Sequence, residues 1–141
     1  MKELDDITGD VLDVALRMHR ELGPGLLESV YEVVMSAKLR QLGYQVLQQH
    51  PVDITFEDIT FPAAFRIDML IDDRLLVEIK SVDQLHAAHA KQLLTYLRLT
   101  RQPVGLLINF SGATLKEGFK RIVNDYTPSA SPRLRVNQIT E

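Results

Sequence analysis

Two short segments, Phe65-Arg66-Ile67-Asp68 and Leu75-Leu76-Val77-Glu78-Ile79-Lys80, decide how this chain folds. They read as two β-strands joined by the charged turn Asp72-Asp73-Arg74. Residues i and i+2 of a strand face the same side, so the side chains at 78 and 80 project together. Two carboxylates and a lysine suit a hydrophobic core poorly. They are well suited to holding a hard divalent cation beside a phosphate.

The length of the turn decides whether the two carboxylates meet. A turn of two residues would put Asp68 and Glu78 on opposite faces of the sheet, as scattered surface charges. A turn of three residues would pair Ile71 with Leu75 and bring Asp68 opposite Glu78, because a slip of one residue reverses every side chain. Three-residue turns are common and need a left-handed residue, which Asp tolerates. Patterning alone leaves both registers open.

The three-residue register has two further consequences. It would place Arg66 opposite Lys80 on the neighbouring strand. It would also set two like charges face to face, which is destabilising unless a cation lies between them. A metal-binding interpretation therefore requires the three-residue turn or a bulge of equal effect.

Length and composition bound the class of protein. The chain has 141 residues, 45% of them hydrophobic and 25% charged, which fits one globular domain. It contains no cysteine, which excludes disulfides and thiolate metal sites. The start does not resemble a signal peptide and no apolar run is long enough to span a membrane, so we expect a cytoplasmic protein. The net charge of −3 argues mildly against nonspecific coating of nucleic acid.

The remaining periodicity predicts an α/β sandwich with a mixed sheet. Helices are expected over residues 8–22, about 26–41 and 84–99, with Thr8 and Asp83 as N-caps and Gly23-Pro24-Gly25 ending the first. Strands are expected over residues 44–49, 52–56, 61–71, 75–82 and 104–108, and residues 115–123 form either an edge strand or a short helix. Pro51 is a break or an edge feature. Residues 1–126 form the domain, and 127–141 read as a flexible tail.

Three further polar residues lie on the predicted helices. Glu28 is expected on a buried helix face beside Val30 and Tyr31, where a carboxylate needs a cation as partner. Gln92 and Tyr96 are four residues apart on one helix face that could approach the carboxylates. Core packing, with the hydroxyl at its rim, is the simpler interpretation of Tyr96.

Two longer motifs extend this pattern. Gly25-Leu26-Leu27-Glu28-Ser29-Val30-Tyr31 spells G-x-x-E-x-x-Y, and Gly105-Leu106-Leu107-Ile108-Asn109-Phe110 follows late in the chain. With these motifs the chain resembles the GxxExxY protein family, which is assigned to the PD-(D/E)xK nuclease-like superfamily. The resemblance covers roughly residues 7–124.

The resemblance implies a restriction-endonuclease-like fold and a nuclease that uses Mg²⁺ or Mn²⁺ to hydrolyse DNA, or less readily RNA. The metal ligands it implies are Glu28, Asp68, Glu78 and the backbone carbonyl of Ile79. Lys80 would assist the attacking water, and Gln92 and Tyr96 match a Q-x-x-x-Y signature that contacts substrate. A catalytically inactive module that binds a protein or nucleic acid is the alternative, and a homodimer is consistent with either.

Overall fold

The structure is a computed structural model, and it describes residues 2–124. Within that range the element order is α1-α2-β1-β2-β3-α3-β4-β5. The helices are α1 (Leu4–Leu22), α2 (Glu28–Gln41) and α3 (Ala87–Thr100). The strands are β1 (Val46–Phe56), β2 (Ile59–Ile71), β3 (Leu75–Lys80), β4 (Val104–Asn109) and β5 (Phe119–Val123).

The five strands form one mixed sheet in the order β1-β2-β3-β4-β5. β1, β2 and β3 make an antiparallel meander, α3 crosses over to the parallel strand β4, and β5 returns antiparallel. The expected α/β class with a mixed sheet is confirmed. Every residue of β4 is buried, as its continuous apolar sequence predicts for a strand covered on both faces.

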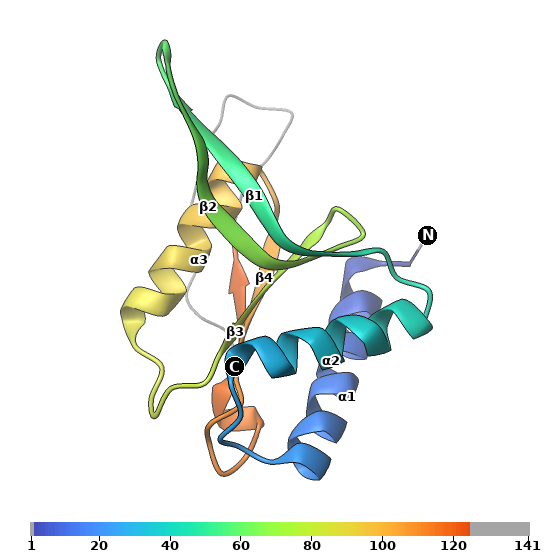
Figure 1. The fold of residues 1–141 in the computed structure, drawn as a ribbon. Helices are drawn as coiled ribbons and strands as arrows, with labels where there is room; N and C mark the ends of the chain where they lie inside the picture. The colour runs from blue at the N-terminus through green and yellow to red at the C-terminus, as the bar shows by residue number, and fades with distance from the viewer. Residues whose placement is uncertain (1, 125–141) are drawn as a thin grey trace.

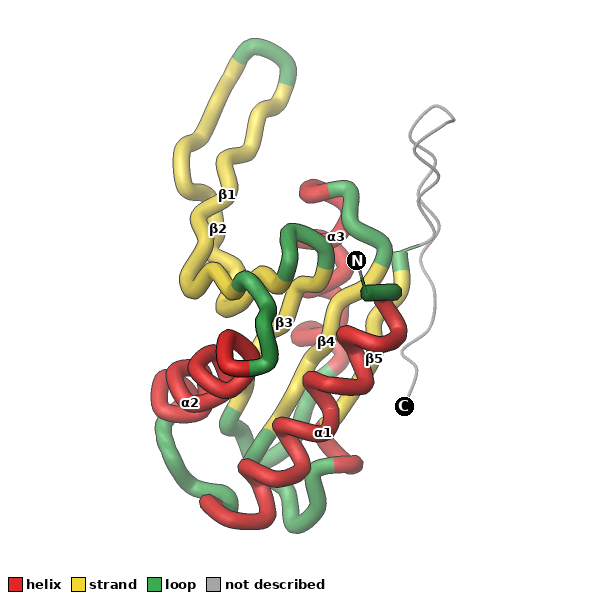
Figure 2. The backbone as a smooth tube through the Cα atoms, turned by 90° about the vertical axis from the view of Figure 1, so that its right-hand side faces the viewer, coloured by secondary structure: helices red, strands yellow, loops and turns green. Residues whose placement is uncertain are grey.

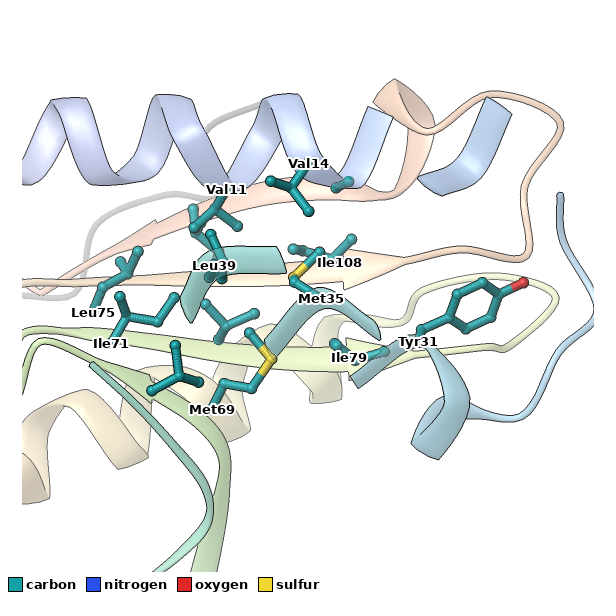
Figure 3. Close-up of a cluster of buried hydrophobic side chains, with 14 of the residues drawn as sticks. Val11, Val14, Tyr31, Met35, Leu39, Met69, Ile71, Leu75, Ile79 and Ile108 are labelled. Atoms are coloured by element: carbon teal, nitrogen blue, oxygen red, sulfur yellow. The ribbon is translucent and has the colours of Figure 1, made fainter. Parts of the chain in front are cut away.

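Helices cover both faces of the sheet (Figures 1 and 2). α1 and α2 pack on one face and α3 on the other, which produces two hydrophobic clusters separated by the strands. Figure 3 shows the first cluster, in which side chains of α1, α2, β2, β3 and β4 converge. Its labelled members include Val11, Met35, Leu39, Ile71 and Ile108, all fully buried. Alternation along β3 sends Val77 and Ile79 into this cluster.

The first strand differs from its prediction. Residues 44–49 and 52–56 do not form two strands, because β1 runs without interruption through Pro51, which pairs with Arg66. β1 lies at the edge of the sheet, where a residue without an N–H is tolerated, so the edge interpretation of Pro51 is confirmed. Three strands therefore precede α3 and two follow it, instead of four and one. Residues 115–123 combine both alternatives, a 3₁₀ turn (Lys116–Gly118) and the edge strand β5.

Two predicted helix starts are wrong. α1 begins at Leu4, and Thr8 lies inside it, donating from Oγ1 to the carbonyl of Leu4 (3.0 Å) rather than capping. The N-cap of α3 is His86 rather than Asp83. The end of α1 is confirmed, since Gly23 follows it with φ 74° and its N–H returns to the carbonyl of His19.

The outer halves of β1 and β2 form an arm, residues 52–64, that projects from the body of the molecule (Figure 2). The register pairs Ile54 with Phe61 and Phe56 with Ile59, so these four apolar side chains share one face of the ribbon. The other face carries the hydroxyls of Thr55 and Thr60, 3.0 Å apart. Phe56, Ile59 and Phe61 are 65–68% exposed, so this apolar face is uncovered in the single chain.

The predicted flexible tail, 127–141, lies outside the described residues, and so do the last two positions of the predicted domain. Among the described helices, none has the length and hydropathy that crossing a membrane requires.

Candidate active site

The turn between β2 and β3 has three residues, as the metal-binding interpretation requires. Ile71 pairs with Leu75, and the ladder continues to Met69 and Val77. Asp72 and Asp73 both have left-handed backbones, with φ 52° and 55°. The prediction of a left-handed Asp is confirmed, and it applies to two residues instead of one.

Beyond Met69 and Val77 the two strands stop pairing, and side chains take over the hydrogen bonds. The N–H of Asp68 donates to Oε2 of Glu78 (2.8 Å), and the N–H of Ile79 donates to Oδ2 of Asp68 (2.9 Å). Each carboxylate thus accepts from the backbone of the opposite strand. This exchange brings the two carboxylates together at the point where β2 leaves β3.

The expected pairing of Arg66 with Lys80 does not form. The β2–β3 ladder ends at Met69, and Arg66 pairs with Pro51 of β1 instead. Beyond Met69, β2 therefore continues beside β1 without pairing with β3.

Burial and repulsion act together on Glu78. Glu78 is only 5% exposed. Burial first, and then the negative charge of Asp68, raises the pKa of Glu78 to about 8. The charge of Lys80 opposes this shift without cancelling it. A carboxylate held in this way gains from a nearby cation, because the cation would neutralise two like charges at once.

The end of β3 is hydrogen-bonded to residues at the end of β4, which positions the backbone of Lys80. The carbonyl of Lys80 accepts from the N–H of Phe110 (3.1 Å). The side chain of Asn109 binds the backbone of Val82 at both its N–H (3.0 Å) and its carbonyl (2.9 Å). The Asn-Phe pair that ends the second sequence motif therefore secures the chain just after Lys80.

The G-x-x-E-x-x-Y motif is a structural unit that presents Glu28 to this end of β3. Tyr31 is fully buried, stacks on Phe110 (ring centroids 4.2 Å apart), and donates from Oη to the carbonyl of Gly23 (2.5 Å). Its hydroxyl also accepts from the N–H of Leu26 (3.2 Å). Glu28 begins α2, and its Oε2 accepts from the N–H of Ser81 (2.9 Å), the residue that follows Lys80.

The expectation that Glu28 lies on a buried face is wrong. Glu28 and Val30 are exposed, whereas Tyr31, Glu32 and Met35 are buried, so the buried face of α2 starts later than predicted. The helix turns its interior side toward the sheet at Tyr31, and the first turn remains open. Glu32, four residues after Glu28 and on the same side of the helix, is the buried carboxylate.

Sequence reasoning missed Glu32 and the two glutamines that bind it. Oε2 of Glu32 accepts from Gln48 (3.0 Å) and Oε1 accepts from Gln49 (2.7 Å), both on β1. Nε2 of Gln49 also donates to Oδ1 of Asp68 (3.2 Å). The spacing of Glu28 and Glu32 could have indicated a second carboxylate on this side of α2. Nothing in the sequence pairs Gln49 with either acid.

The helix α3 contributes Tyr96 to the surroundings of the carboxylates. Its ring stacks on Phe65 at 4.0 Å, in agreement with the packing interpretation. Burial, followed by the negative charges of Glu78 and Asp68, raises the pKa of Tyr96. Gln92 lies one turn earlier and is exposed. Within residues 2–124 its side chain forms no hydrogen bond to either carboxylate, so the structure does not bring it into the cluster.

The start of α3 places His89 near Lys80 and Glu28. The N–H of His86 donates to Nδ1 of His89 (3.0 Å). Burial first, and then the positive charges of Lys80 and His86, lowers the pKa of His89, while Glu28 acts in the opposite direction. His89, Lys80 and Glu28 are therefore close enough for their charges to interact.

Asp68 and Glu78 are the candidate ligands for a divalent cation. Among the described residues, no three His, Asp or Glu side chains converge as a complete set of ligands. Mg²⁺ typically takes one or two protein carboxylates and keeps several waters. Asp68 and Glu78 meet that requirement. A bound cation would also stabilise the negative charge of Glu78, which burial and Asp68 disfavour. The residues fit a Mg²⁺ or Mn²⁺ ion.

Comparison with known proteins agrees with this geometry. A family model described as the PD-(D/E)XK nuclease superfamily matches residues 5–122. The chain belongs to the PD-(D/E)XK nuclease superfamily. No curated protein and no solved structure matches the chain. Membership in the PD-(D/E)XK superfamily supports a nuclease type of function in general, and superfamily members generally use divalent metals and act on nucleic acid.

The match extends across all three helices and the five strands, and it ends at β5.

Proposed function

We propose that this protein is a Mg²⁺- or Mn²⁺-dependent nuclease of the GxxExxY type that hydrolyses phosphodiester bonds of DNA, and RNA less readily. The observation that carries the proposal is the exchange of hydrogen bonds between Asp68 and Glu78. It holds two carboxylates together although burial and the charge of Asp68 disfavour the charged form of Glu78. Such an arrangement needs a cation to reach its charged form at neutral pH.

Each residue has a role in this proposal. Asp68 and Glu78 bind the metal with the carbonyl of Ile79, and Glu28 at the start of α2 completes the acidic side. The ion, when bound, lowers the pKa of a water and neutralises charge on the scissile phosphate. Lys80 orients the attacking water or stabilises the negative charge that builds up on the phosphate oxygens. Gln92 and Tyr96 are proposed to contact the substrate from α3.

The test is cleavage of plasmid DNA, single-stranded DNA and RNA with Mg²⁺, with Mn²⁺ and with chelator. We expect metal-dependent cleavage by the native protein and a loss of about 100-fold or more in Glu78→Gln and Lys80→Ala. Glu57→Gln, at the tip of the arm, and Lys38→Ala, an exposed position on α2, are the matched controls and should retain activity. Equal activity in the native protein and both site variants would contradict the proposal.

A specific observation favours the second candidate, a catalytically inactive module that binds another protein. Phe56, Ile59 and Phe61 lie on one face of the arm and are 65–68% exposed, and clustered exposed apolar side chains often mark a protein interaction site. Residues 52–64 include Asp53, Glu57 and Asp58 and no basic residue, so the arm repels phosphates. A protein with an apolar surface rimmed by basic side chains would complement it.

Metal titration by calorimetry separates the two candidates. Binding of Mn²⁺ or Mg²⁺ at millimolar concentration or below, abolished in Glu78→Gln, supports the nuclease. No metal binding, together with no cleavage of any nucleic acid, would favour the binding module.

A further inference from the structure

Gln49 has a backbone conformation that its residue type does not favour. Its φ is 51°, in the left-handed region, although it lies inside β1 between the paired residues Gln48 and His50. Those neighbours pair with Met69 and Ile67, so Gln49 lies across from Asp68. A non-glycine residue in this region persists when its surroundings hold it, and such positions occur often at functional sites.

The side chain of Gln49 is held from two sides. Its Nε2 donates to Oε1 of Glu32 (2.7 Å) and to Oδ1 of Asp68 (3.2 Å), which uses both of its N–H groups. Because both partners are carboxylates, the nitrogen of the amide must face them. Glu32 is 8% exposed and is itself fixed by Gln48, so it forms a rigid anchor for the amide.

We propose that Gln49 is a positioning residue that orients the carboxylate of Asp68 for metal binding, with buried Glu32 as its anchor. This inference rests on the proposed metal-dependent function. Asp68 is held at Oδ2 by the N–H of Ile79 and at Oδ1 by Gln49, which together define the plane of the carboxylate. One hydrogen bond on each oxygen leaves a lone pair on each for a cation.

The chain provides a matched control at the adjacent position. Gln48 is the same residue type on the same strand and also donates to Glu32. Its side-chain oxygen, Oε1, accepts from Arg40 (3.2 Å), and within residues 2–124 its side chain forms no hydrogen bond to Asp68. Loss of either glutamine removes one hydrogen bond from Glu32, but only loss of Gln49 also frees Oδ1 of Asp68.

The experiment measures Mn²⁺ affinity by calorimetry and Tm in the absence of metal for Gln49→Ala, Gln49→Gly and Gln48→Ala. Both Gln49 variants should bind Mn²⁺ about 10- to 100-fold more weakly, the usual effect of removing a group that orients a metal ligand. Gln48→Ala should stay within about threefold of the native affinity. Gln49→Gly should have a higher Tm than Gln49→Ala, because glycine accepts the left-handed backbone.

This design separates positioning from stability. The two Gln49 variants differ in Tm but should share the same loss of affinity. Affinity that follows Tm across the three variants would overturn the inference in favour of a structural role. Native affinity in both Gln49 variants, with binding abolished in Glu78→Gln, would overturn it and leave the proposed nuclease intact. A native protein that binds no Mn²⁺ would overturn both.

Discussion

At the scale of single residues, the protonation of Glu78 links the candidate site to stability. Its side chain is buried beside Asp68, and its pKa in the folded protein is about 8, compared with 4.5 when unperturbed. The folded state therefore keeps a proton that the unfolded chain releases between these two values. Stability that is fully present below pH 4.5 is lost as the pH rises toward 8.

We predict that Glu78→Gln removes this pH dependence. Without metal, the native protein should lose a few kcal/mol of unfolding free energy between about pH 5 and pH 8, because the unfolded state binds fewer protons. The glutamine variant cannot ionise and should show a much smaller change. Urea denaturation at several pH values measures both. Parallel pH profiles for the two proteins would show that Glu78 is not responsible.

Two glycines give a contrasting prediction. A Cβ at Gly118 would lie 2.3 Å from the carbonyl oxygen of Asn109, the residue that clamps the end of β3, so Gly118→Ala should cost about 1–3 kcal/mol. Gly9 is inside α1 with nothing within 4 Å of an added Cβ. Gly9→Ala should stabilise the protein by about 0.5–1 kcal/mol. Chemical denaturation tests both, and equal effects would contradict the steric argument.

At the scale of elements, the β2–β3 turn is the connection on which the site depends. Asp72 is tied to the start of β1, since its N–H donates to the carbonyl of Gln45 (2.9 Å) and its Oδ1 accepts from the N–H of Gln45 (2.8 Å). The side chain of Asp73 has no such bond within residues 2–124, although its carbonyl accepts from Gln102 (2.8 Å). Both residues have left-handed backbones.

This difference predicts opposite outcomes for one substitution at adjacent positions. Asp73→Gly relieves the left-handed backbone and should stabilise the protein by up to about 1 kcal/mol. Asp72→Gly gains the same relief but loses the side-chain bond to Gln45, which contributes about 1 kcal/mol, so its net effect should be near zero or destabilising. Thermal unfolding of both variants checks the order, and a less stable Asp73→Gly would contradict it.

The same elements show which local patterns predict structure. The end of α1 at Gly23 and the buried strand β4 follow from residue type and apolar continuity, and both were predicted. β1 was divided wrongly at Pro51 because a proline is compatible with a strand only at a sheet edge. Which strand lies at the edge depends on the whole sheet, so the local pattern could not decide it.

At the scale of the whole molecule, the structure consists of a packed body and an arm that lies outside the core. Phe56, on the arm, is 68% exposed, whereas Phe110 is fully buried and stacks on Tyr31. Phe56 is the last residue of β1, and Phe110 directly follows β4. Only their position in the fold distinguishes them.

We predict that the same substitution has very different effects at these two positions. Phe56→Ala should change the unfolding free energy by less than about 1 kcal/mol, because the side chain is already in contact with water. Phe110→Ala should cost about 3–5 kcal/mol, because it leaves a cavity beside Tyr31. Urea denaturation measures both. A large loss in Phe56→Ala would show that the arm is covered in solution, for example by a second copy of the chain.

The sequence by itself determined which residues form the local half of the candidate site, because Asp68, Glu78 and the turn residues Asp72 and Asp73 all lie within one hairpin. It left the register of that hairpin open, and the structure decided it with a three-residue turn that brings the two carboxylates together. Only the tertiary structure decided the other half. Glu32 comes from α2, Gln49 from β1 and Asp68 from β2, and they meet because α2 packs across the sheet. Periodicity specifies which side of an element is buried, but contacts between distant segments depend on how the elements dock, and no local pattern records that.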